Sequence, residues 1–490
     1  MSTIGFAETP PIIRLAAQLR RVSWLALIVM VPVVCYFTTQ GTWDLTKQNN
    51  DGGWSGGFYW EQAESMLVRG RLDVEPTDLL GECFERDGRC YGYFGLTPSL
   101  VRLPFLGILR FLHSALTPLY LALALLVAYG AALRILGRSL CELSEPHSTG
   151  GYQLGAFALG ALALGPGSTL LLLARPAVYE EAIAWGVAFF LLTLNHVWAW
   201  HSRETRSLVP AVVFGILAAN ARPTAATACG VLGLVAAWAC WRRGSTRREL
   251  VAVLCLSLLP GLTAAGVFWL KLRTPIPSVL MSKQVQQAPH WREILQRNGG
   301  QTSGLIFTPT ALLAYFRPDT VVRRPEWPLF VFRFPEEPIR WVPPLPVGGA
   351  YVEHPVSVTT TMPLPWIVTV VGAIGLGVER RRLSRARTAR TDSAGSAALW
   401  ERWTFELGLL TSAVAMAALT VTTVGITNRY VADFFATSVV GLAVGYRMCG
   451  PPLMRRPLLG TLAGLTGLLL VAWSLVVNLS LATQLAFYWG

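Results

Sequence analysis

The stretch "WRRGSTRRELVAVLCLSLLPGLTAAGVFWL", residues 241–270, sets four arginines directly before a long apolar run. The run at 250–270 has no charged residue, and about 20 apolar residues are enough for a helix to cross the hydrocarbon core of a bilayer. Short cytoplasmic loops hold an excess of arginine and lysine. The stretch therefore predicts a membrane helix that starts on the cytoplasmic side.

Similar apolar runs recur along the whole chain. Of its 490 residues, 53% are hydrophobic and only 14% are charged, which is unusual for a soluble domain. We expect an all-α polytopic membrane protein with about eleven transmembrane helices. They are predicted at 22–40, 114–137, 152–173, 178–199, 208–220, 224–241, 250–270, 363–379, 403–424, 430–447 and 457–487.

The distribution of basic residues predicts the orientation of these helices. Six short segments hold 21 of the 41 arginines and lysines, whereas each short connection of opposite parity holds one, at Arg175, Arg222 and Arg429. Short loops rich in arginine and lysine stay in the cytoplasm. We therefore expect a cytoplasmic N-terminus and, after an odd number of spans, an extracytoplasmic C-terminus. The net charge of +13 reflects this sidedness and implies no nucleic-acid partner.

The same parity divides the chain into regions and places its two long loops outside. These regions are the cytoplasmic N-terminus 1–21, an N-terminal module 22–270 of about seven helices that includes the outer loop 41–113, a proline-rich outer loop 271–362 with thirteen prolines, and C-terminal helices 363–490. Near the ends of the outer loops, the amphiphilic segments 94–112 and 305–316 are too broken or too short to span. We expect them to be helices at the outer interface.

The sequence "CFERDGRC" in the first outer loop contains two of the eight cysteines. Asp87-Gly88 is a hairpin-turn signal, and a hairpin would bring Cys83 and Cys90 close enough for a disulfide. A disulfide suits an extracytoplasmic compartment. Two free thiols are the alternative, because this spacing is not diagnostic.

Several common catalytic motifs are missing from the sequence. It contains no GxxxxGK[ST], no HExxH and no CxxC, so the usual residues for ATP hydrolysis and zinc chemistry are lacking. The basic run "RRRLSRARTAR" at 380–390 lies between two spans, where membrane lipids are its expected partners.

Acidic residues gather instead at the predicted outer mouths of the helices. Such carboxylates could act as a general base or hold a divalent cation such as Mg²⁺, Mn²⁺ or Ca²⁺, with Asp51 and Glu180 as the candidate ligands. The alternative is that they are loop charges or helix caps, since acids are favoured in the first turn of a helix. The candidate catalytic residues are Asp44, Asp51, Glu61, Glu180 and Glu181.

Basic and aromatic residues lie at the same predicted depth. A planar guanidinium suits a phosphate group, and the candidate phosphate-binding residues are Arg222, Lys271, Arg273 and Arg429. Trp54, Tyr59 and Trp60 could stack on sugar rings, although tryptophan and tyrosine also form interfacial belts.

The order of these features resembles the GT-C class of integral-membrane glycosyltransferases, which includes bacterial aminoarabinose transferases, protein O-mannosyltransferases and mycobacterial arabinosyltransferases. The resemblance covers most of the transmembrane core. It rests on an acidic outer loop followed by Tyr-x-x-x-Ala-x-x-x-Leu-x-x-Gly from Tyr59, "YGYFGLTPSLVRLPF" at 91–105, "RPAVYEEAIAWG" at 175–186 and "NRYVADF" at 428–434. It implies a polyprenyl-phosphate-linked sugar as donor, a hydroxyl acceptor on a glycan, lipid or protein, and inverting transfer at the outer face of a bacterial cytoplasmic membrane.

One position departs from the pattern of the class. Members often carry an acidic pair three or four residues before the tyrosine, where this chain has Ser55 and Gly56. The nearest acid is Asp51, which makes it the first candidate for the base, with Asp44 and Glu61 behind it.

Two other classes of function fit a polytopic chain of this kind. A lipid-linked-sugar flippase or another transporter is expected to place polar residues and broken helices near the bilayer midplane, whereas the charges here gather at one face. A non-catalytic membrane assembly subunit could carry similar loops, and only an activity would exclude it.

Overall fold

The computed structural model of the protein describes residues 11–44, 57–74, 83–92, 95–109, 116–143, 151–165, 167, 169–275, 296, 299–301, 303–333, 350–351, 356–388, 393–423, 425–426 and 428–488.

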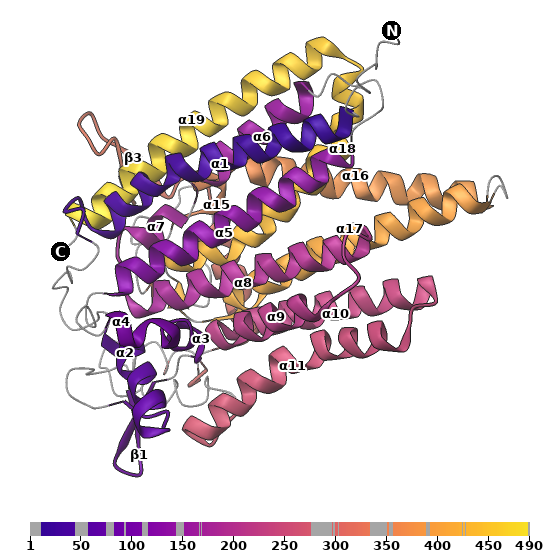
Figure 1. The fold of residues 1–490 in the computed structure, drawn as a ribbon. Helices are drawn as coiled ribbons and strands as arrows, with labels where there is room; N and C mark the ends of the chain where they lie inside the picture. Colours follow the sequence, from indigo (N-terminus) through magenta and orange to yellow (C-terminus); the bar gives the residue numbers. More distant parts are fainter. Residues whose placement is uncertain are drawn as a thin grey trace, which may run out of the picture.

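Long helices lying side by side form a bundle (Figure 1). Nine helical stretches among the described residues are long and apolar enough to cross a membrane. The prediction of an all-α multi-pass membrane protein is therefore confirmed. The helices of these stretches are α1 (Pro11–Thr38), α5 (Leu116–Cys141), α6 (Gly151–Leu164) followed by α7 (Thr169–Leu173), α8 (Val178–His201), α10 (Pro223–Arg243), α11 (Arg247–Leu272), α17 (Ser393–Ala418), α18 (Phe435–Met454) and α19 (Pro457–Phe487).

Two of the eleven predicted spans differ from these nine. The segment at 208–220 forms α9 (Val209–Ala221), whose 13 residues cover about 20 Å and cannot cross the core alone. The segment at 363–379 forms α16 (Pro363–Thr388), which has 26 residues but ends in a strongly basic stretch that lowers its mean hydropathy.

Small residues bring α16 and α18 into close contact. Gly441 and Gly445 are four apart on α18, and a Cβ atom at either would collide with Thr369 or Val368 of α16. Glycines spaced in this way let two helix backbones approach each other within a membrane. Close packing against α18 therefore holds the weakly apolar α16 in the bundle.

Burial differs sharply among the helices. In α8, 89% of the most apolar window is buried, against 17% in α1, 22% in α11 and 28% in α19. The helix α8 is therefore central, while α1, α11 and α19 expose apolar side chains such as Leu258 and Leu468 at the rim, where lipid would cover them.

The first loop contains the expected hairpin. Strands β1 (Cys83–Arg86) and β2 (Arg89–Gly92) pair antiparallel around Asp87 and Gly88, which both have positive φ. This backbone is the one that a two-residue hairpin turn requires. Arg86 fastens the hairpin to the end of α11, because its Nη1 donates to the Lys271 carbonyl oxygen at 2.8 Å.

The rest of the first loop folds into short helical pieces. They are α2 (Gly57–Glu64), a π-helical turn η1 (Ser65–Arg69), α3 (Thr97–Leu100), η2 (Leu103–Phe105) and α4 (Leu106–Leu109). The predicted interfacial helix at 94–112 is therefore broken where it is described. Pro98 and Pro104 lie in the first turns of α3 and η2, where proline is tolerated, and each keeps its helix from extending toward the N-terminus.

The second loop packs on the segment before α18. It contains η4 (Leu305–Phe307), α14 (Thr308–Phe316), β3 (Val321–Arg323), β4 (Phe330–Phe332), β5 (Ala350–Tyr351) and α15 (Val358–Thr361). Strand β5 pairs in parallel with β6 (Gly425–Ile426), which follows η5 (Thr420–Thr422) and precedes the 3-10 helix η6 (Asn428–Phe434). The "NRYVADF" segment thus lies next to this loop.

Six charged side chains join the helix ends that the arginine count assigns to the cytoplasm. Glu142 accepts from Arg402 at 3.0 Å and from Arg447 at 3.3 Å, and both arginines also contact Glu406. Arg243 pairs with Glu401 at 2.7 Å. We call these six residues the inner cluster, and we call the opposite end of the bundle the outer end.

Candidate functional site

A fully buried ion pair connects the first loop to α8 at the outer end. Arg102, between α3 and η2, donates from Nη2 to Glu181 Oε2 at 2.7 Å and from Nη1 to the other carboxylate oxygen. Its Nη1 also donates to the Pro98 carbonyl at 2.8 Å. The guanidinium carbon lies 4.2 Å from the ring centre of Tyr120. Through Arg102, Glu181 thus holds the α3–η2 part of the first loop against α8.

The helix α2 packs on the start of α8 beside this pair. The Tyr59 hydroxyl donates to the Val178 carbonyl at 3.0 Å, and its ring is fully buried. Phe58 fills the space next to Gly92, where a Cβ atom would overlap its ring. The hairpin, α2 and the first turn of α8 therefore form one packed unit.

A second ion pair connects α8 to η6. Arg429 Nη1 lies 3.4 Å from Glu180 Oε1, and the guanidinium carbon lies 4.3 Å from the ring centre of Tyr179. Glu180 is only 3% exposed. This pair joins "RPAVYEEAIAWG" to "NRYVADF", which are two of the four motifs on which the resemblance rests.

A third ion pair lies between the α9–α10 connection and η6. Arg222 contacts Asp433, which also accepts from the Thr420 hydroxyl at 2.5 Å. Pro223 requires an extended residue before it, and Arg222 has φ −143° and ψ 121°. A Cβ atom at Gly186 would collide with that of Arg222, so this glycine lets the arginine lie against α8.

The three pairs meet through shared elements. Glu180 and Glu181 are adjacent on α8, and Arg429 and Asp433 belong to the same 3-10 helix. We call this set the outer cluster, namely Arg102, Arg222, Arg429, Glu180, Glu181 and Asp433. Its formal charge is zero, so an incoming oxyanion would find arginines already oriented by carboxylates.

The predicted phosphate-binding residues divide into two groups. Arg222 and Arg429 lie in the outer cluster. Lys271 is buried at the end of α11 under the hairpin, and Arg273 caps that helix with φ 55°. The contacts described for Lys271 and Arg273 are thus with the hairpin and the helix end.

The predicted acids and aromatics of the first loop are placed only in part. Asp44 is exposed after α1, Glu61 is half-buried on α2, and the Trp60 ring packs in the core. Tyr59 and Trp60 are both buried, so in this conformation they pack beneath the surface and offer no exposed ring face to a sugar. Asp51 and Trp54 lie outside the described residues.

The predicted metal and disulfide sites lie partly outside the residues that the structure describes. Within the described part of the chain, no three His, Cys, Asp or Glu residues gather as metal ligands. A site that uses Asp51 would lie beyond that part. Cys90 is disulfide-bonded, while the side chain of Cys83 is not described, and the pairing of the two stays a prediction.

Sequence reasoning did not propose Arg102 as a site residue. The signal was present, because an arginine within the apolar segment 94–112 needs a partner acid in a membrane protein. Asp433 carried a similar signal as the acid that follows Arg429 in the same short motif.

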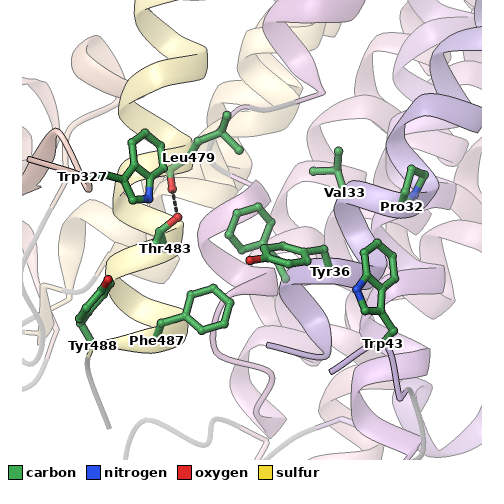
Figure 2. Close-up of a pocket in the computed structure, with 10 residues that line it drawn as sticks. Pro32, Val33, Tyr36, Trp43, Trp327, Leu479, Thr483, Phe487 and Tyr488 are labelled. Carbon is green, nitrogen blue, oxygen red and sulfur yellow. Dashed lines mark hydrogen bonds between the residues drawn. The ribbon is translucent and has the colours of Figure 1, made fainter. Parts of the chain in front are cut away.

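A separate cavity of about 790 Å³ lies between the outer ends of α1 and α19 (Figure 2). Aromatic side chains line it, with the rings of Tyr36 and Phe487 5.8 Å apart. Trp43 and Trp327 also line it, and they are 59% and 50% exposed. The cavity therefore lies between two helices that face lipid.

Comparison with known proteins adds no relative. Neither a protein-family model, nor a curated protein, nor a solved structure matches this chain.

Proposed function

We propose that the protein is a membrane glycosyltransferase that moves a sugar from a polyprenyl-phosphate donor to a hydroxyl acceptor, with inversion, at the outer face of a bacterial cytoplasmic membrane. The observation that carries the proposal is the outer cluster. Acids and arginines from four distant segments meet at one end of a polytopic bundle, and three of these segments are among those that resemble GT-C enzymes.

In this reaction the acceptor oxygen bonds to the anomeric carbon while the bond from that carbon to the phosphate oxygen breaks. The acceptor proton passes to a carboxylate, and polyprenyl phosphate leaves with the bonding electrons. A positioned general base typically contributes about 10²–10⁴-fold to the rate. We assign this role to Asp51, with Glu180 supporting it from α8.

The arginines of the cluster suit the donor phosphate. Arg429 is 14% exposed and lies at 3.4 Å from its carboxylate, so a phosphate oxygen could replace Glu180 in part. Arg222 pairs with Asp433 of η6, the same short helix that carries Arg429, and it is the second candidate for contact with the phosphate. The Arg102–Glu181 pair is enclosed, and its role is to position α3 and the start of α8.

The aromatic cavity between α1 and α19 supports a donor with a long apolar chain. Both helices are mostly exposed at the rim of the bundle, so a lipid chain could enter between them from the bilayer. Tyrosine and tryptophan rings at its mouth suit the boundary between chain and head group.

The assigned base is tested by Asp51→Asn in purified protein supplied with a panel of polyprenyl-phosphate sugars. Turnover should fall about 10²–10⁴-fold while donor binding persists. Asp44→Asn and Glu61→Gln are the matched comparisons, and both should retain turnover. Retained turnover in Asp51→Asn with loss in one of the others would move the role to that neighbour.

The location of the site is tested by labelling. A cysteine from Ser303→Cys should react only from outside the cell, and one from Ser393→Cys only from the cytoplasm. Reaction of both from one side would contradict the predicted topology and the outer placement of the cluster.

A flippase for a lipid-linked sugar is the second candidate. It is favoured by α9, which is too short to span and ends at the charged residue Arg222. Broken helices of this kind often form transport sites. Movement of the lipid-linked sugar between leaflets without any transfer, unchanged in Asp51→Asn, would support this candidate.

A further inference from the structure

A groove of about 610 Å³ runs between α9 and α11, and none of its lining residues belongs to either charged cluster. Its walls include Val209 and Val213 of α9 and Val251 of α11, which are 60%, 48% and 52% exposed. With 13 residues against 26, α9 cannot cover the whole of α11. The exposed valines place the groove on the side of the bundle that would face lipid. The two helices that form it are neighbours in the bundle (Figure 1).

Two arginines line the same groove. Arg247 and Arg248 form the first turn of α11, where the helix dipole disfavours cations. The nearby acid Glu249 is engaged elsewhere, since its Oε2 accepts from the Thr246 backbone at 3.0 Å and its Oε1 from the Trp200 indole at 3.2 Å. Among the described residues, no carboxylate pairs with either arginine.

We propose that this groove binds an anionic phospholipid, with an acyl chain between α9 and α11 and the phosphate on Arg247 and Arg248. The aliphatic walls and the two cations match the two parts of such a lipid. Basic pockets between transmembrane helices on the cytoplasmic side recognise anionic head groups in this way. A free phosphate ion would use the arginines but leave the aliphatic walls empty.

The proposal does not depend on the glycosyltransferase assignment. It uses residues at the ends of α9 and α11 that the arginine count places in the cytoplasmic leaflet, whereas the outer cluster lies at the other end of the bundle. Loss of lipid binding would leave the assignment of the outer cluster unaffected, and the reverse also holds.

The test uses the full-length protein in nanodiscs of phosphatidylcholine with a trace of photoreactive phosphatidylglycerol that carries a diazirine in one acyl chain. Peptide mass spectrometry should find adducts on α9 and α11. The double variant Arg247→Gln with Arg248→Gln should lower these adducts by about twenty-five-fold, since each arginine near the surface contributes about fivefold to anionic-lipid affinity. Arg381→Gln with Arg382→Gln removes the same charge from α16 and should leave them unchanged.

A second variant tests the apolar half of the site. Val251→Trp fills the groove at an exposed helical position and leaves both arginines in place, so adducts on α9 and α11 should fall at least fivefold. Three results would overturn the proposal: equal labelling by photoreactive phosphatidylcholine, labelling unaffected by the arginine variants, or labelling unaffected by Val251→Trp. Displacement of the lipid by millimolar inorganic phosphate would likewise show a simple anion site.

Discussion

The inner and outer clusters contain the same charges in different arrangements. Each has three carboxylates and three arginines, and each joins elements that are distant in the sequence. In the inner cluster Glu142 and Glu406 each contact both Arg402 and Arg447, and both arginines lie within the long regular helices α17 and α18. In the outer cluster each acid is paired with a different arginine, and most of the arginines lie on short or irregular elements.

We interpret this difference as one between a structural role for the inner cluster and the functional role that we propose for the outer cluster. A shared network keeps some of its contacts when one member is lost, which suits the task of holding helix ends together. One-to-one pairs can be opened singly, which suits a site where a substrate phosphate must replace a carboxylate. Within the outer cluster, burial further distinguishes the enclosed Arg102–Glu181 pair from the more accessible Arg429–Glu180 pair.

The largest expected effect is at Arg102. Arg102→Gln leaves Glu181 buried without its counter-charge, and loss of one partner of a buried pair costs about 3–5 kcal/mol. The free energy of unfolding in detergent, measured by denaturant titration, should fall by that amount. Glu181→Gln should cost a similar amount, and the double variant should cost less than the sum. Additive losses would show that the two side chains do not act as a pair.

At Arg429 we expect a loss of function with a smaller loss of stability than at Arg102, because the Arg429 side chain is 14% exposed. Arg429→Gln removes the charged contact that we propose to the donor phosphate, and hydrogen bonds to charged groups contribute about 1.5–3 kcal/mol. The apparent affinity for the donor should therefore fall about 10–100-fold in a binding assay. The same substitution at Arg102 is the matched comparison, since it should affect mainly unfolding. Unchanged donor affinity in Arg429→Gln would remove the proposed phosphate site.

The sequence predicted the helices far better than the contacts between them. Long apolar runs such as 250–270 depend only on local composition, and most appear as helices with similar bounds. The meeting of Glu180 with Arg429 depends on how α8 packs on η6, which no local pattern encodes. The broken segment at 94–112 illustrates the limit, because its arginine was visible but its partner Glu181 lies 79 residues away.

Loss of one acid from the inner cluster should have a moderate effect. In Glu142→Gln both Arg402 and Arg447 keep their contact with Glu406, and Glu142 is itself 27% exposed. We expect the free energy of unfolding to fall by about 1–2 kcal/mol, in the range for a hydrogen-bonded group that loses its charge. If the free energy of unfolding fell as much as in Arg102→Gln, the shared contacts of the inner cluster would not limit the loss of stability when one acid is removed.

The smallest expected effect concerns a partly exposed pair outside the spans. Arg317 Nε donates to Asp319 Oδ1 at 2.7 Å, and this hydrogen bond lowers the pKa of the Asp319 carboxyl, with further lowering by the charges of Arg317 and Arg333. A lowered folded-state pKa stabilises the fold above the unfolded value of about 3.9, and the contribution is lost as the pH falls through the folded value. Asp319→Asn should therefore lower the free energy of unfolding at pH 6 by less than about 1 kcal/mol, seen as a slightly lower unfolding temperature. The difference from the unchanged protein should shrink toward pH 3. An equal difference at both pH values would show that the carboxylate charge does not stabilise this loop, and that only buried pairs such as Arg102–Glu181 contribute measurably at the outer end.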